Sequence, residues 1–226
     1  MIEHIIIAGN GKLSNNILDG LPKLISGFHA DRWDNNDLYP LNSKVIVHIG
    51  SGRQFNDVIN FCRETKTPLI QGSTDITGSF NDVDFKYVDS PNFNIIMLKF
   101  MHMIKVYGFQ FQKYNISITE SHQETKKSLP GTALEFAKSL GISSDEIISI
   151  RDTVVQEKQL NIPKENLQLH AFHEITIGDG STSIDIKTLV KGHDSYVTGL
   201  AAIINSLGSL HNRYYHVMDL LDMGLI

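Results

Sequence analysis

Short and almost wholly apolar runs alternate with helix-spaced segments through the first 90 residues. Apolar residues recur at helical spacing over 12–21 and over 55–65, and the segment 33–43 shows no period, so we expect it to be mostly loop. Apolar strands separated by helices are typical of a parallel sheet that is covered on both faces. We therefore expect an α/β domain whose buried strands cover residues 2–8, 25–30, 44–49 and 68–70.

The pattern changes after Asn92. Residues 94–105, 131–141 and 198–210 have the composition of helices, and Gly141 is placed to end the second of them. Alternating polar and apolar residues over 115–120, 167–177 and 183–191 predict half-buried strands, with a hairpin turn at 178–180. The fold class that we predict is thus α/β, with an α+β domain containing a mixed or antiparallel sheet after the first domain.

Composition restricts the classes of function. The 226 residues carry a net charge of -5 and 41% hydrophobic residues, which is ordinary for a globular protein and predicts no general affinity for nucleic acid. The single cysteine, Cys62, excludes a disulfide framework or cysteine-based metal site within one chain, and we expect it to be buried on an apolar helix face. No apolar run reaches the ~20 residues that span a bilayer. The N-terminus begins with a strand-like run rather than a leader, so we expect a cytoplasmic protein with no membrane partner.

A glycine turn follows the first predicted strand. In Gly9-Asn10-Gly11-Lys12-Leu13-Ser14 the first glycine permits a tight turn and the second permits close approach of the backbone to a pyrophosphate, while Ser14 occupies the third position. About 22 residues beyond the turn, Asp31 suits ribose hydroxyls and Arg32 tolerates a 2′-phosphate. The position of the turn between strand and helix favours a Rossmann-like dinucleotide site over an ordinary βα turn.

Two further turns are expected at the same edge of the sheet. Gly50-Ser51-Gly52-Arg53 follows the third strand, and Gly72-Ser73-Thr74 follows the fourth. Ligands of open α/β sheets bind outside the carboxyl ends of the strands, so these turns support a shared crevice. His48 is unusual within an apolar strand, because a buried imidazole needs a hydrogen-bond partner.

The segment 120–133 holds the most distinctive chemistry. It places His122 and Lys126 just ahead of a Pro-Gly-Thr turn that opens a helix at Gly131 and Thr132. A helix start presents unpaired N–H groups to an anion, so this combination suits protonating and holding a carboxylated substrate. His170 and His173 fall on opposite faces of a strand, which argues against a shared metal, and we predict no metal site. His193 follows a strand end and could either approach the site or face water.

The same residues resemble a known family. Glu-x-His-x-x-x-Lys followed by Pro-Gly-Thr-Ala is similar to the signature of dihydrodipicolinate reductases, whose form is Glu-x-His-His-x-x-Lys-x-Asp-x-Pro-Ser-Gly-Thr-Ala. Residues 72–74 resemble the family's Gly-Thr-Thr, and 90–93 resemble the Ala-Pro-Asn-Phe segment that joins the two domains. Residues 172–174 resemble its Gly-Glu-His strand, and 217–221 its Met-x-Asp-Val-Leu ending.

The resemblance implies a role for each matched residue. His122 would be the proton donor, Lys126 would bind a substrate carboxylate, and Gly131 with Thr132 would hold a carboxylate. Gln123 and His193 occupy substrate-binding positions of the family. The cofactor would be NADH or NADPH, and its binding site would be lined by Gly9, Asn10, Gly11, Lys12, Leu13, Asp31, Arg32, Gly50, Ser51, Gly72, Ser73, Thr74, Ser90, Asn92 and Phe93.

The family also implies a domain plan and an assembly. Residues 1–92 and 200–226 would form the dinucleotide-binding domain, and 93–199 the domain for substrate binding and oligomerisation. The expected assembly is a homotetramer built through the C-terminal sheet. The expected reaction is the NAD(P)H-dependent reduction of 4-hydroxy-tetrahydrodipicolinate, a cyclic dicarboxylate of lysine and diaminopimelate biosynthesis.

Four departures from the family pattern leave alternatives open. Gln123 replaces the second histidine, Ser128 replaces the aspartate, the serine before Gly131 is missing, and His193 stands where the family has an arginine. These positions shape the carboxylate site. The chain could therefore reduce a different cyclic imine or dicarboxylate, or it could be a catalytically silent NAD(P)-binding regulatory homologue.

Overall fold

The chain forms two compact units in the computed structural model. Unit 1 comprises residues 1–98 and 193–226, and unit 2 comprises residues 99–192. The structure describes residues 2–50, 52–73, 76, 78, 80, 82–127 and 129–226, without the side chains of residues 35, 36 and 38. The predicted cofactor residues Ser51 and Thr74, and the altered position Ser128, therefore lie outside the described residues.

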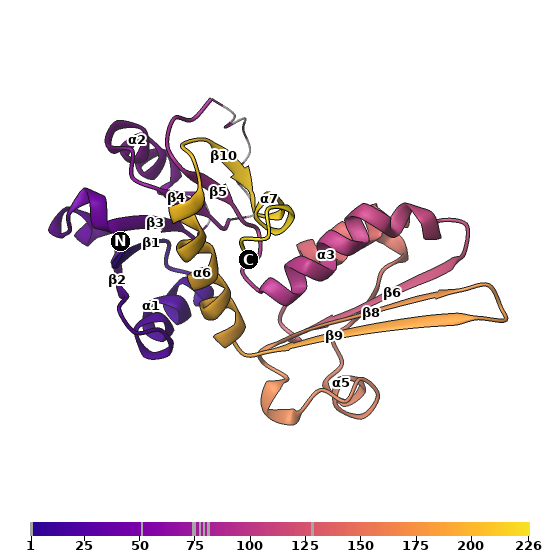
Figure 1. The fold of residues 1–226 in the computed structure, drawn as a ribbon. Helices are drawn as coiled ribbons and strands as arrows, with labels where there is room; N and C mark the ends of the chain where they lie inside the picture. Colours follow the sequence, from indigo (N-terminus) through magenta and orange to yellow (C-terminus); the bar gives the residue numbers. More distant parts are fainter. Residues whose placement is uncertain are drawn as a thin grey trace. The chain divides into compact units, whose positions relative to one another are not determined.

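Unit 1 is built on a six-stranded parallel sheet (Figure 1). Its order is β10-β5-β4-β3-β1-β2, so the chain leaves β1 on one side for β2 and then crosses to the other side for β3. That reversal places a crevice at the carboxyl ends of β1 and β3, where ligands of such sheets bind. The strands are β1 (His4–Ala8), β2 (His29–Arg32), β3 (Lys44–His48), β4 (Leu69–Gln71), β5 (Tyr87–Asp89) and β10 (Tyr214–His216).

Helices pack against this sheet in unit 1. Gly20 and Val197 bring α1 and α6 together, because a Cβ on the glycine would lie 3.2 Å from the valine methyl. Cys62 on α2 is fully buried in the apolar cluster beneath the sheet, as predicted. The helices are α1 (Lys12–Leu24), α2 (Phe55–Thr65), α6 (Asp194–Ser206) and α7 (Val217–Asp222).

Unit 2 contains a mixed four-stranded sheet of order β7-β6-β8-β9. The antiparallel strands are β6 (Asn115–His122), β8 (His170–Gly178) and β9 (Ser183–Lys191), and β7 (Ile148–Ile150) runs parallel to β6. Its helices are α4 (Gly131–Leu140) and α5 (Thr153–Lys158), while α3 (Ile95–Tyr107) begins in unit 1 and continues into unit 2. The predicted α/β plus α+β fold class is confirmed. Gly141 ends α4 with a φ of +73°, also as predicted.

Several predicted boundaries were wrong. The segment 33–43 holds two 3-10 helices, Trp33–Leu38 and Leu41–Ser43, rather than loop. The second strand begins at His29 because residues 25–27 form the turn that follows α1, with Gly27 at a φ of +90°. The strand predicted from 167 begins at His170, after the 3-10 turn Lys164–Asn166, and the last long helix begins at Asp194 and gives way to the 3-10 turn Leu207–Ser209. Further 3-10 turns are Gly108–Phe111 and Ser144–Glu146.

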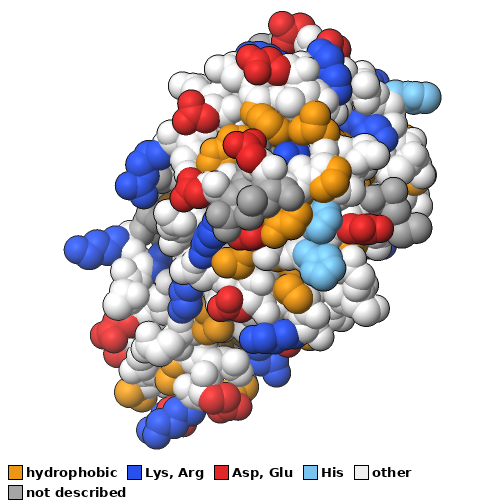
Figure 2. Space-filling view, turned by 90° about the vertical axis from the view of Figure 1, so that its left-hand side faces the viewer, with side chains coloured by type: hydrophobic (Ala, Val, Ile, Leu, Met, Phe, Trp, Pro, Cys, Tyr) orange, Lys and Arg blue, Asp and Glu red, His pale blue; other side chains and the backbone are white. Residues whose placement is uncertain are grey.

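Charges of both signs are mixed on the surface. On the face that Figure 2 shows, Lys and Arg side chains are interspersed with Asp and Glu. Among the helices formed by the described residues, none has both the length and the apolar character that crossing a bilayer requires.

Candidate functional site

The glycine turn and the third-strand turn enclose a pocket at the carboxyl edge of the sheet in unit 1. Its volume is ≈ 530 Å³, and its lining includes Gly9, Asn10, Gly11, His48 and Gly50. Gly9 has a φ of +129°, and a Cβ there would lie 1.9 Å from the carbonyl O of Ile49. The sequence therefore needs glycine at this point, both for the backbone angle and for the close contact between the two turns.

No side chain of the described residues caps the backbone N–H groups at the start of α1. Gly11 is the N-cap residue and supplies no side-chain hydrogen bond to the first turn. Ser14, at the third position of the turn, is fully buried and donates to the carbonyl O of Gly11 at 2.7 Å. A small buried residue thus fills the position where close helix–strand packing is required, and the N–H groups before it can bind an anion.

Asp31 and Arg32 lie at the end of β2, and Arg32 reaches the glycine turn. The Arg32 Nη1 donates to the carbonyl O of Gly9 at 2.7 Å, and its other terminal nitrogen donates to Asn15. Asp31 accepts a hydrogen bond from the Tyr39 hydroxyl at 2.7 Å, an interaction that raises the pKa of Tyr39. The predicted acidic–basic pair is therefore brought to the same edge as the turn.

His48 has the partners that its burial requires. Its Nδ1 lies 2.8 Å from Gln71 Oε1 and 3.1 Å from Ser73 Oγ, and the same Ser73 Oγ accepts the Gly50 N–H at 2.8 Å. These bonds join the turn after β3 to the turn after β4, which agrees with the prediction that both turns lie at the same edge of the sheet. Gly72 is closely packed, since a Cβ on it would lie 2.4 Å from Phe93 Cζ.

Residues 90–93 form a hydrogen-bonded turn before α3. Ser90 Oγ donates to the carbonyl O of Asn92 at 2.6 Å, and Asn92 Oδ1 accepts the Asn94 N–H at 2.9 Å. The carbonyl O of Phe93 lies so close to α6 that a Cβ on Gly199 would be 1.7 Å from it. Phe93 is thereby fixed between α6 and Gly72 within unit 1.

His193 lies at the N-cap of α6, in unit 1. Both of its ring nitrogens are buried and lack a hydrogen-bond partner among the described residues. Burial lowers the pKa of His193, and the positive charge of Lys12 lowers it further. The ring is therefore neutral near pH 7, unlike the arginine of the family.

Unit 2 holds His122 against a buried ion pair. Glu120 Oε2 lies 2.9 Å from His122 Nδ1, and the Glu120 side chain is 0% exposed. Arg151 binds both oxygens of this carboxylate, with distances of 2.6 Å from Nη2 and 3.1 Å from Nη1, and Ser149 donates to it at 2.5 Å. Burial alone would raise the pKa of Glu120, but the hydrogen bonds from His122, Arg151 and Ser149 together lower it to about 2. The ionised carboxylate therefore fixes the orientation of the His122 ring.

The loop after His122 is tied to the same arginine. Arg151 Nε donates to the carbonyl O of Lys126 at 2.9 Å, and the Lys126 N–H donates to the carbonyl O of Gln123 at 2.9 Å. The predicted helix start is confirmed, because α4 begins at Gly131 and Pro130 provides no side-chain cap. The amides of Gly131 and Thr132 are thus available to an anion.

Two more histidines flank the His122 ring. Its centroid lies 5.8 Å from that of His173 and 6.5 Å from that of His170. Burial and the nearby His122 lower the pKa of His173 to about 3, so that this ring is neutral. The strand register puts His170 and His173 on opposite faces, as predicted. The described residues contain no group of three His, Cys, Asp or Glu side chains able to hold a metal ion.

Sequence reasoning missed most of the groups around His122. Glu120 could have been found, because residues two apart on a strand share a face. Arg151, Ser149 and Gln156 gave no comparable indication; Gln156 is fully buried and donates to the carbonyl O of His122 at 2.8 Å.

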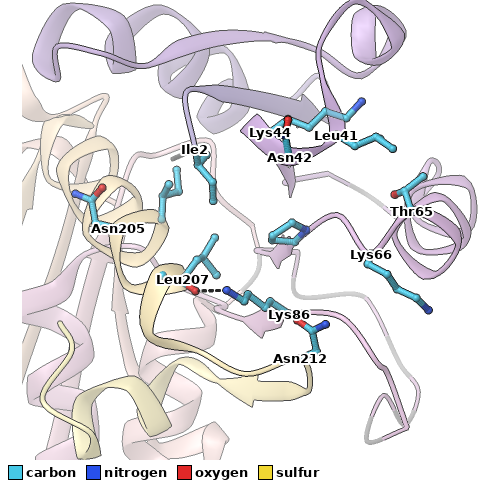
Figure 3. Close-up of a pocket in the computed structure, with 13 residues that line it drawn as sticks. Ile2, Leu41, Asn42, Lys44, Thr65, Lys66, Lys86, Asn205, Leu207 and Asn212 are labelled. Carbon is cyan, nitrogen blue, oxygen red and sulfur yellow. Dashed lines mark hydrogen bonds between the residues drawn. The ribbon is translucent and has the colours of Figure 1, made fainter.

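A second pocket, of ≈ 510 Å³, opens at the opposite edge of the unit 1 sheet and is shown in Figure 3. Lys44, Lys66 and Lys86 line it, but each amine already has an interaction. Lys66 pairs with Asp84, Lys86 Nζ donates to the carbonyl O of Leu207 at 2.7 Å, and Lys44 Nζ lies 4.8 Å from the Phe61 ring centroid. We therefore place the candidate site at the glycine turns and not here.

Comparisons with known proteins agree on one family. The family model described as "Dihydrodipicolinate reductase, C-terminus" matches residues 96–221, more than half of the chain. A chloroplastic 4-hydroxy-tetrahydrodipicolinate reductase of Arabidopsis thaliana is 25% identical over 201 residues, which cover 80% of this chain and 58% of the relative. A 4-hydroxy-tetrahydrodipicolinate reductase of Rickettsia rickettsii is 21% identical over 240 residues, covering 97% of this chain and 99% of the relative. The chain thus spans a little over half the length of the plant relative.

Solved structures agree on the fold. A dipicolinate-bound dihydrodipicolinate reductase of Paenisporosarcina superposes with a TM-score of 0.65 at 16% identity, covering 96% of this chain and 98% of that one. A probable dehydrogenase of Thermotoga maritima gives a TM-score of 0.52 at 11% identity, covering 93% and 90%.

Proposed function

The chain belongs to the dihydrodipicolinate reductase family, and on that premise we propose that it reduces 4-hydroxy-tetrahydrodipicolinate to tetrahydrodipicolinate with NADH or NADPH, the 4-hydroxyl group of the substrate leaving as water. The observation that carries this proposal is the position of His122. A buried and ionised Glu120 holds its ring, and the loop with Lys126 and the uncapped N-terminus of α4 follow it in the chain. A role in lysine and diaminopimelate biosynthesis, a cytoplasmic location and a homotetramer complete the proposal.

The residues at the glycine turns fit a dinucleotide. The ≈ 530 Å³ pocket, the uncapped start of α1 and the Cβ-intolerant Gly9 together form a cradle for a pyrophosphate. Asp31 and Arg32 would contact the adenosine ribose or its 2′-phosphate, and residues 90–93 would lie toward the nicotinamide. When bound, the reduced nicotinamide supplies the hydride.

His122 would supply the proton that accompanies the hydride. An ionised carboxylate can only accept, so Glu120 requires a proton on His122 Nδ1. Nε2 is then the atom from which a protonated ring gives its proton to the substrate. A general acid positioned in this way contributes roughly 10²–10⁴-fold in rate.

Cationic and dipolar groups near His122 would hold the substrate carboxylates. The Lys126 ammonium can pair with one carboxylate, and the amides of Gly131 and Thr132 with the Thr132 hydroxyl can bind an anion at the positive end of α4. Arg151 holds the Lys126 backbone in place, because its Nε donates to the Lys126 carbonyl O.

The main test replaces His122 with Gln. We expect turnover to fall about 10²–10⁴-fold with NADH affinity unchanged, because the proton donor is lost while the unit 1 pocket is untouched. The assay follows NADH absorbance with substrate freshly made by the preceding aldolase, and NADH affinity is measured by titration. His211→Gln, at an exposed position, is the matched control. Unchanged turnover in His122→Gln would remove His122 from the mechanism.

A second candidate is a reductase for a different cyclic imine or carboxylate. The neutral ring of His193, in place of the family's arginine, favours it, because one fixed cation is missing. Comparing kcat/KM across cyclic imines with one and two carboxylates separates this candidate from the first. NADH binding without turnover of any of them would instead indicate a catalytically silent homologue.

A further inference from the structure

His48 presents one defined nitrogen to the pocket at the glycine turns. The residue ends β3, is 1% exposed and lines that pocket together with Gly9, Gly11 and Gly50. Its Nε2 lies 4.0 Å from the point that a Cβ on Gly50, another residue lining this pocket, would occupy. Its Nδ1 is engaged on the other side, with Gln71 of the neighbouring strand.

The Gln71 amide has only one orientation that satisfies its contacts. Its Nε2 donates to the carbonyl O of Ser73 at 2.8 Å, and its Oε1 accepts the Ser73 N–H at 3.1 Å. Exchanging the two amide atoms would place the Gln71 oxygen against the Ser73 carbonyl O and the Gln71 NH₂ group against the Ser73 N–H, so that both bonds would be lost. The atom 2.8 Å from His48 Nδ1 is therefore the amide oxygen.

This orientation fixes the tautomer of His48. An amide oxygen only accepts, so the His48 Nδ1 must carry a proton and donate it to Gln71. Burial lowers the pKa of His48, which keeps the ring in its singly protonated form. Nε2 consequently has a free lone pair, and the pocket wall at this point is a neutral hydrogen-bond acceptor.

We propose that His48 Nε2 accepts a hydrogen bond from a ribose hydroxyl of the bound dinucleotide. The inference rests on the proposed cofactor. A phosphate oxygen cannot donate to a lone pair, so the pyrophosphate must lie at the glycine-turn amides instead. Each ribose is bonded directly to that pyrophosphate, which makes its hydroxyls the nearest donors of the ligand. His48 is thus a cofactor-positioning residue contributed by the end of a central strand.

Two substitutions separate this role from a purely structural one. In His48→Asn the shorter side-chain amide matches the Nδ1 position and can still donate to Gln71, but nothing then reaches the pocket. The longer amide in His48→Gln matches the Nε2 position and retains an acceptor there, while the bond to Gln71 is lost. The proposal predicts that His48→Asn binds NADH about tenfold more weakly, the cost of one hydrogen bond, and that His48→Gln loses less than about threefold.

The experiment titrates NADH and NADPH into wild type and both variants, with far-UV circular dichroism to confirm folding. A change in the ¹⁵N shift of His48 Nε2 when NADH is added to wild type would support the proposal, since a structural role leaves that shift unmoved. Equal weakening in both variants, or stronger weakening in His48→Gln, would overturn it. Wild type that binds neither nucleotide would refute the proposed function, and with it this inference, before any variant is compared.

Discussion

Replacing Glu120 with Gln removes the negative charge of the buried Glu120–Arg151 ion pair in unit 2. In the native protein this carboxylate is 0% exposed and receives hydrogen bonds from Arg151, His122 and Ser149. The amide of Gln can accept only at one atom and places a donor against the remaining partners. Arg151 would then be left without its carboxylate, which is the costly outcome for a charge at a partly buried site.

The magnitude follows from the pKa of Glu120. Its folded value of about 2, against 4.5 for an unperturbed side chain, corresponds to about 3 kcal/mol of stability at pH 7. Because the folded pKa is the lower one, this stability is present above pH 4.5 and is lost as the pH falls toward 2. With these two pKa values, the contribution of Glu120 to the free energy of unfolding falls by about 2 kcal/mol between about pH 7 and about pH 3. The stability difference between wild type and Glu120→Gln should therefore shrink by that amount over the same range.

Urea unfolding at about pH 7, 4 and 3 measures this difference. Hydrogen exchange of peptides covering β6 should be the probe, because the only tryptophan, Trp33, lies in unit 1. Glu174→Gln is the matched control, since the ion pair of Glu174 with Lys187 lies at the surface of the same sheet and should contribute less than about 1 kcal/mol. A wild-type-to-Glu120→Gln difference that stays constant across this pH range would refute the assignment of a buried, ionised Glu120.

Three further predictions concern the two candidate sites. Gly9→Ala should destabilise unit 1 by about 2 kcal/mol or more and weaken NADH binding, because the new Cβ would lie 1.9 Å from a backbone oxygen. The control Gly11→Ala, whose Cβ meets nothing within 4 Å, should unfold like wild type, and the same denaturation midpoint for both variants would contradict this prediction. Lys126→Met should raise KM for the carboxylated substrate about 10- to 100-fold in steady-state assays while Lys127→Met leaves it unchanged, and a changed NADH affinity instead would exclude the substrate role. Arg32→Gln should weaken NADPH more than NADH in parallel titrations; an unchanged ratio of the two dissociation constants would show that Arg32 does not contact the 2′-phosphate.

Sequence alone could predict the site where local spacing carried the information. The glycine turn, its place between strand and helix, and the start of α4 at Gly131 all depend on neighbours within a few residues. The need for a partner of His48 was also predictable, and its identity follows from register, because His48 pairs with Gln71 in adjacent parallel strands. That register is set by the packing of whole strands, which a single sequence does not display.

Contacts between distant segments were beyond such reasoning. Arg151 lies 31 positions from Glu120 and follows β7, whose three residues are too few to show a period. The same limit applies to β5 and β10, which have three residues each. The helix α6 was placed four residues late because it opens with the polar Asp194 and Ser195, which do not show the apolar spacing of its interior.

The burial of Cys62 has a practical use. This thiol is 0% exposed in the unit 1 core, and burial raises its pKa, so it stays protonated and out of reach of alkylating reagents. Since it is the only cysteine of the chain, two engineered cysteines, one on each unit, would be the reactive thiols without removal of the native one. A donor dye on one unit and an acceptor on the other would then report, by energy transfer, how the separation of the units changes when nucleotide is added.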